Sequence, residues 1–102
     1  METKVTLIYD NPQDAEAFEA EYPDLLVSAG KSPGLRRMET SKVWPKEDGS
    51  PSPAYRLVDL YFADYEAASA AVITAEASGF FPRSLELATG WVRISFAGIE
   101  ES

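Results

Sequence analysis

The hydrophobic pattern of the chain switches between the period of strands and the period of helices, and this succession constrains its fold most. Four segments carry the β-branched and aromatic residues and the two-residue alternation typical of strands: residues 4–9, 35–44, 54–62 and 91–97. The stretch after the first strand and the stretch from residue 64 onward carry apolar residues at helical spacing instead. The predicted order is therefore strand, helix, strand, strand, helix, strand.

Local signals set the course of the first helix. Asn11 is predicted to cap it, with Pro12 in the first helical position and Asp14 adding negative charge where the helix dipole favours it. Pro23 lies inside the helix, removes a backbone donor and clashes with the carbonyl group four residues back. We therefore predict a kink or a restart near Tyr22.

The second helix is expected to begin at Asp64, which is suited to cap its free amide groups. Ser78 and Gly79 should interrupt it. A further helical turn through Leu85 and Leu87 is then expected before the last strand.

An order β-α-β-β-α-β is the ferredoxin-like unit, in which a four-stranded antiparallel sheet carries two helices on one face. We therefore predict the α+β class. A chain of 102 residues suits one domain, residues 1–102, because two cores of half this size would be too small to be stable. Residues 45–53, polar and proline-rich, are expected at the tip of the central hairpin.

Strand alternation assigns side chains to the two faces of the sheet. The face expected beneath the helices carries Ile8, Met38, Val58, Leu60, Phe62, Val92, Ile94 and Phe96. The opposite face mixes apolar with charged residues: Val5, Leu7, Tyr9, Tyr55, Leu57 and Tyr61 with Arg37, Glu39, Asp59 and Arg93. Because an exposed sheet face is usually polar, an apolar face of this size favours association. We expect a homodimer through this open face, with Arg37 or Arg93 meeting Asp59 across the interface.

Composition excludes several classes of function. The chain has no cysteine and no histidine, which removes disulfides, zinc-thiolate sites, thiol nucleophiles and histidine-carboxylate metal sites. Its net charge of −8 repels nucleic acid and anionic lipid surfaces. No apolar run approaches the ~20 residues of a membrane span, and the first four residues lack the layout of a signal peptide. We therefore expect a cytoplasmic protein without metal, cofactor, nucleic-acid partner or membrane partner.

Several short segments recur in the order and spacing of a known family pattern: residues 4–14 with Phe18, residues 33–37, residues 53–56 and residues 60–62. Together they resemble the EthD-like family, named for ethyl tert-butyl ether degradation, over most of the chain. The resemblance implies a dimeric α+β barrel with a pocket between sheet and helices in each subunit. Relatives of this architecture include cofactor-free monooxygenases, polyketide cyclases, lactone isomerases and haem-degrading enzymes. Many family members carry a histidine near the position of Leu25, and its absence argues against an imidazole base and against haem ligation.

The candidate site residues lie where the first helix, the hairpin base and the interrupted second helix should converge. Tyr22, Trp44 and Phe80, with Leu25, are predicted to line a substrate-binding pocket, although aromatic residues suit a core equally well. The Tyr22 hydroxyl is the strongest candidate, as a hydrogen-bond donor to an oxygenated ligand. Asp24 is the candidate general base, if the reaction needs one, against the alternative of a solvated carboxylate.

Two classes of function stay open at this point. The first is an EthD-like small-molecule-binding protein that acts as a cofactor-free oxidoreductase or monooxygenase, isomerase or cyclase on an apolar, oxygen-bearing substrate. The second is a non-catalytic ligand-binding or accessory dimer beside an oxygenase system, which the missing histidine favours. A haem-handling protein is the third and weakest hypothesis, because nothing in the sequence would support a tyrosine ligand to iron.

Overall fold

The computed structural model describes residues 1–50, 52, 54–77 and 92–100. Its elements follow in the order β1 (Thr3–Tyr9), α1 (Ala15–Gly30), β2 (Arg37–Lys42), β3 (Arg56–Phe62), α2 (Tyr65–Ala77) and β4 (Val92–Gly98). This order confirms the predicted ferredoxin-like α+β class. The helical turn predicted through Leu85 and Leu87 lies outside the described residues.

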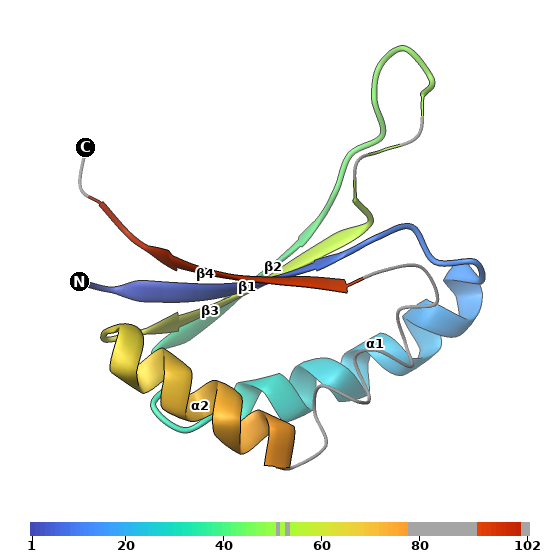
Figure 1. The fold of residues 1–102 in the computed structure, drawn as a ribbon. Coiled ribbons are helices and arrows are strands. Elements are labelled where there is room, and N and C mark those ends of the chain that lie inside the picture. The colour runs from blue at the N-terminus through green and yellow to red at the C-terminus, as the bar shows by residue number, and fades with distance from the viewer. Residues whose placement is uncertain (51, 53, 78–91, 101–102) are drawn as a thin grey trace.

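The strands form one antiparallel sheet in the order β2-β3-β1-β4. Both helices cover the same face of this sheet, and the described residues leave the other face uncovered (Figure 1). Neither helix, among the residues described, is both long and apolar enough to cross a membrane.

Helix α1 begins later than predicted and runs without a break. Asp14, not Asn11, is the N-cap, and its carboxylate accepts a hydrogen bond from the amide of Ala17 at 3.1 Å. Asn11 instead donates to the carbonyl oxygen of Ser52 at 3.0 Å, which holds the start of the helix against the hairpin. Pro23 does not restart the helix. Pro23 is exposed, while Tyr22 and Leu25 on the inner side of the same turn are buried in the core, so their tertiary contacts compensate for the lost donor.

Helix α2 begins as predicted. The Asp64 carboxylate accepts a hydrogen bond from the amide of Ala67 at 2.8 Å, which is the capping interaction expected of this residue.

Strand β1 presents the opposite face from the one predicted. Val5, Leu7 and Tyr9 are buried beneath the helices, whereas Ile8 is half-buried on the open face. The register agrees, because Leu7 pairs with the buried Val58 of β3 and paired residues share a face. Alternation separates the two sets but does not say which set faces inward. In this structure, the more apolar set is the one that packs against the helices.

The other strands follow the prediction with one further exception. Val58, Leu60 and Phe62 are buried, and Met38 and Val92 pack against the same core. Tyr55 was expected on the open face, but its ring lies 5.2 Å from that of Phe18 on the helix side. It precedes β3, so the alternation of that strand does not apply to it.

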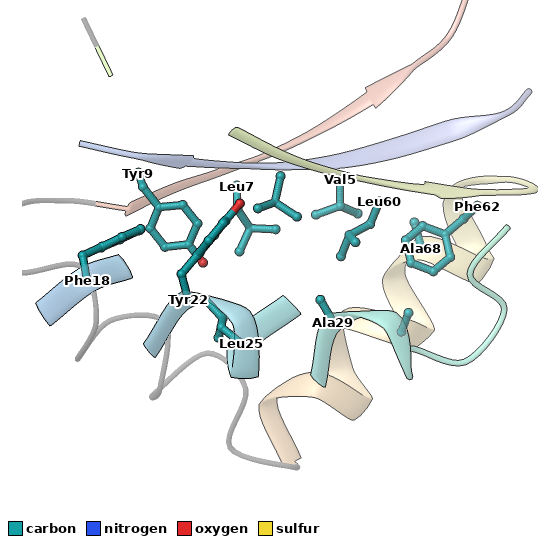
Figure 2. Packing of buried hydrophobic residues seen from close by; sticks show 12 residues of the cluster. Val5, Leu7, Tyr9, Phe18, Tyr22, Leu25, Ala29, Leu60, Phe62 and Ala68 are labelled. Atoms are coloured by element: carbon teal, nitrogen blue, oxygen red, sulfur yellow. The ribbon is translucent and has the colours of Figure 1, made fainter. Parts of the chain in front are cut away.

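The core lies between sheet and helices, where side chains of β1 and β3 meet the inner face of α1 (Figure 2). Ile94 and Phe96 pair with Leu7 and Val5 and so belong to the helix side, yet they stay 41% and 37% exposed. Strand β4 is one of the two edge strands of the sheet, with β2 at the opposite edge.

The corrected orientation of β1 has a direct test. Leu7 is 1% exposed, so Leu7→Ala should lower the free energy of unfolding by about 2–5 kcal/mol through lost burial and a cavity. Ile73→Ala, on the exposed side of α2, is the control and should change it by less than about 0.5 kcal/mol. Urea denaturation of both variants measures the difference. A Leu7→Ala variant as stable as the control would place Leu7 on the open face after all.

Candidate functional site

A charged and aromatic cluster crosses the layer between α1 and the sheet. Glu19 and Tyr22 lie three positions apart on α1, and this spacing puts them on one side of the helix. Arg56 opens β3 opposite Tyr9 in the sheet register, which places it on the side that faces the helices. Helix periodicity and strand register thus bring these side chains together from opposite sides of the layer.

Glu19 and Arg56 form the charged part of the cluster. The Nη2 group of Arg56 donates to both carboxylate oxygens of Glu19, at 2.7 and 2.9 Å. The Tyr55 hydroxyl donates to Oε1 of the same carboxylate at 2.8 Å. Three hydrogen bonds therefore fix the Glu19 carboxylate and, through it, the guanidinium group.

Aromatic rings form the apolar part. Phe18 stacks on Tyr22 with 5.5 Å between ring centroids, and it meets Tyr9 and Tyr55 edge-on. The guanidinium carbon of Arg56 lies 4.5 Å from the centroid of the Tyr22 ring, within the range of a cation–π contact. The charged pair is thus flanked by aromatic rings, while the side chains of Arg56 and Glu19 stay 19% and 35% exposed.

Two hydrogen-bond donors of this cluster are left over. The Tyr22 hydroxyl and the Nε–H group of Arg56 are buried and have no hydrogen-bond partner among the described residues. Tyr22 is only 5% exposed, and it rises from α1 toward the sheet (Figure 2). A buried donor without a partner costs about 1–3 kcal/mol. An acceptor atom supplied from outside would remove this cost.

The protonation states make the cluster a donor site. Burial raises the pKa of Tyr22, so its hydroxyl keeps the proton at neutral pH. The hydrogen bond from Arg56 lowers the pKa of Glu19, so its carboxylate stays ionised and occupied. The cluster therefore offers donors to a ligand but no uncommitted base.

The structure brings together only some of the predicted site residues. Tyr22 and Leu25 are both buried on the inner side of α1. Asp24 lies on the exposed side of the same helix, and Trp44 is 87% exposed beyond the end of β2. Phe80 lies outside the described residues. The binding roles of these residues and the role of Asp24 as a base stay predictions.

Sequence reasoning missed Glu19, Tyr55 and Arg56. One signal was available. Arg56 lies two positions before Val58 in the same strand, so its side chain belongs to the face that the helices cover. A charged residue on a buried face needs a partner of opposite charge. Glu19, one turn before Tyr22 on the inner side of the helix, was the candidate.

An open pocket lies elsewhere, at the start of α2 beside the end of β4. Its volume is about 480 Å³, and it is lined by Met1, Thr3, Asp64, Tyr65, Glu66, Phe96, Ala97 and Gly98. None of the predicted site residues lines it. The described part of the chain contains no group of three acidic side chains close enough to hold a metal ion.

Solved structures establish the fold. An ethyl tert-butyl ether degradation (EthD) family protein from Bacillus halodurans superposes with a TM-score of 0.87 at 24% identity, over 98% of this chain and 100% of that chain. A dimeric ferredoxin-like protein from an uncultured marine organism gives a TM-score of 0.66 at 19% identity, over 99% and 97% of the two chains. SnoaB, a cofactor-independent oxygenase from Streptomyces nogalater, gives 0.62 at 15% identity, over 99% and 94%. The chain thus has the ferredoxin-like α+β fold that these proteins share.

Sequence comparison adds a closer relation. The chain is 30% identical over 98 residues to an uncharacterized 11.0 kDa protein in the thcB-thcC intergenic region of Rhodococcus erythropolis, which covers 95% of this chain and 94% of that protein. The chain belongs to the same family as this Rhodococcus protein. No protein-family model matches the chain.

The ion pair between Glu19 and Arg56 should make the free energy of unfolding depend on pH. The pKa of Glu19 is lowered in the folded state by its hydrogen bond with Arg56, so the stability it contributes is present above its ordinary value of 4.5 and is lost as pH falls through the folded pKa. The difference in unfolding free energy between wild type and Glu19→Gln should therefore narrow from pH 7 to pH 3. Urea denaturation across this range measures it. Glu21→Gln, at an exposed position of the same helix, is the control; a gap for Glu19→Gln that stays constant with pH contradicts the assignment.

Proposed function

We propose that this protein binds an apolar, oxygen-bearing small molecule between α1 and the sheet, with the ligand oxygen accepting hydrogen bonds from Tyr22 and Arg56. The observation that carries this proposal is the pair of buried donors without partners. Buried polar groups in folded proteins are nearly always paired, and exceptions call for a role. A ligand oxygen supplies the acceptor that the described residues do not.

The surroundings of the two donors fit the rest of such a ligand. Phe18 and Leu25 are buried beside Tyr22 on the inner side of α1 and offer apolar and aromatic contacts. Small-molecule sites typically combine an apolar lining with a few placed polar groups. An aromatic ketone or a phenol matches this combination.

The same donors define the chemistry that the site would support. A guanidinium group and a neutral hydroxyl placed on one oxygen stabilise negative charge as it develops there, as in an enolate or a phenolate. In isomerisation, cyclisation or oxygenation through such an anion, the substrate loses its proton to solvent, because Glu19 is already hydrogen-bonded, and oxygenation then consumes dioxygen as the oxidant. We propose that the protein acts in this reaction class without a cofactor, in keeping with its fold likeness to a cofactor-independent oxygenase.

A non-catalytic ligand-binding or accessory module is the second candidate. It is favoured by the commitment of Glu19, whose carboxylate is held by Arg56 and Tyr55 and so is not free to remove a proton. Turnover of a bound ketone or phenol would support the first candidate, and binding without turnover would support the second.

Removal of the Tyr22 hydroxyl tests the site. Tyr22→Phe should weaken the binding of acetophenone by about 2–10-fold, because one hydrogen bond to the ligand oxygen is lost. The binding of ethylbenzene, which has the same ring and no oxygen, should stay unchanged. Isothermal titration or NMR titration measures both ligands. An equal loss of affinity for acetophenone and ethylbenzene, or no loss of affinity for acetophenone, would contradict the proposed role of the Tyr22 hydroxyl.

Stability provides the companion measurement. The Tyr22 hydroxyl has no hydrogen-bond partner within the part of the chain that the structure describes, so Tyr22→Phe should not lower the free energy of unfolding. A purely structural hydroxyl would give the opposite result, a less stable variant with unchanged ligand binding.

We also propose that the protein forms a homodimer through the open face of the sheet. Support comes from the chemistry of this face, where Arg37 lies 3.7 Å from the centroid of the Tyr61 ring and Ile8 and Leu57 pair on neighbouring strands. The fold is shared with a protein described as a dimeric ferredoxin-like protein. Asp59 already accepts a hydrogen bond from Thr6 at 2.6 Å within the chain.

A charge reversal on this face tests the dimer. Wild type should have twice the 11.2 kDa mass of the chain, and Arg37→Glu should raise the dimer dissociation constant by at least about tenfold, because it places like charges at the interface. Arg36→Glu is the matched control, since Arg36 is exposed just before β2 and pairs with Glu2. Sedimentation equilibrium measures all three proteins. A monomeric wild type, or equal effects of the two variants, would contradict the open face as the interface.

A further inference from the structure

We infer that Glu19 determines the charge of the ligand that this site accepts, and that it selects a neutral ketone or hydroxyl oxygen over a carboxylate of the same shape. This inference rests on the proposed function and names the substrate class of the same site. It concerns a residue that is held away from the two free donors and acts through Arg56.

The Nη2 and Nε–H groups of the Arg56 guanidinium differ in their hydrogen bonds. The Nη2 group is fully engaged with the Glu19 carboxylate, at 2.7 and 2.9 Å. The Nε–H group is buried and free among the described residues. A ligand oxygen at Nε–H would therefore share one positive charge with a carboxylate that is already bound to it.

Sharing the positive charge of Arg56 with Glu19 has different consequences for neutral and for anionic ligands. A neutral carbonyl oxygen accepts a hydrogen bond from Nε–H and meets no net repulsion. A ligand carboxylate meets a second negative charge, that of Glu19, on the same guanidinium group of Arg56. Glu19 thus lowers the affinity for anions and leaves the affinity for neutral oxygen atoms nearly unchanged.

Other charged groups near Glu19 do not reverse this balance. Lys42, on β2, is exposed, with its Nζ atom 5.7 Å from the centroid of the Tyr55 ring, so water screens its charge. Tyr22 and Tyr55 stay neutral at neutral pH, because burial raises the pKa of both hydroxyls. Among the described groups, the Glu19 carboxylate is the negative charge in contact with Arg56.

The selectivity also has a chemical consequence. A neutral substrate oxygen that becomes anionic during reaction turns from a weakly held group into one that Arg56 and Tyr22 hold more strongly. Interactions that strengthen as charge develops are the ones that accelerate a reaction. Exclusion of ligands that are anionic from the start keeps the site free for substrates that gain their charge there.

The test uses two probes of equal shape, acetophenone and benzoate, with wild type, Glu19→Gln and Glu21→Gln at pH 7. Glutamine keeps an oxygen that accepts from Arg56 and Tyr55 but removes the charge. Glu19→Gln should bind benzoate about tenfold more tightly than wild type, with acetophenone affinity changed less than about threefold. Glu21→Gln removes the same charge from an exposed position and should leave both affinities unchanged.

Two further measurements keep the outcomes separate. Glu19→Asp retains the charge and should retain the preference for acetophenone, and thermal denaturation establishes that each variant is folded. If acetophenone binds wild type and Tyr22→Phe weakens it, but Glu19→Gln leaves benzoate affinity unchanged, the inference about Glu19 is wrong and the proposed site stands. If acetophenone binds wild type and Tyr22→Phe equally, or binds neither, the proposed function itself is overturned.

Discussion

The charged pair of Arg56 and Glu19 inside the helix–sheet layer is the interaction on which the site depends. A guanidinium group on the covered side of a sheet requires a partner, because an unpaired charge is costly in such surroundings. Glu19 provides it from α1, and Tyr55 holds Glu19 in place. The pair connects the helix to β3 and, in doing so, fixes the direction of the Nε–H group that remains free.

The pair also explains why an apolar layer contains unsatisfied donors. Arg56 uses its Nη2 group for Glu19, and the rings of Tyr22 and Tyr55 lie 4.5 and 5.8 Å from its guanidinium carbon. No acceptor from the described part of the chain reaches the Nε–H group or the Tyr22 hydroxyl. Stability alone would favour phenylalanine at position 22, so the hydroxyl is better explained by a ligand than by folding.

The two faces of the sheet divide the proposed roles. The helix face holds the core and the donor cluster, whereas the open face holds paired polar groups such as Thr6 with Asp59 and Arg37 with Glu39. Likeness to EthD-type and oxygenase structures establishes the fold that both faces share, and the family relation is to the Rhodococcus protein. The site proposal follows from the contacts of this chain.

The sequence by itself determined the order of elements, the cap at Asp64, the partition of side chains within β3 and the resemblance to EthD-like proteins. These follow from local periodicity, turn residues and motif order, which act over a few residues. Only the tertiary structure decided which set of β1 faces the helices, that α1 continues through Pro23, and that Glu19, Tyr22 and Arg56 meet. Those features depend on contacts between segments far apart in the chain, and alternation or spacing within one segment carries no information about its partner.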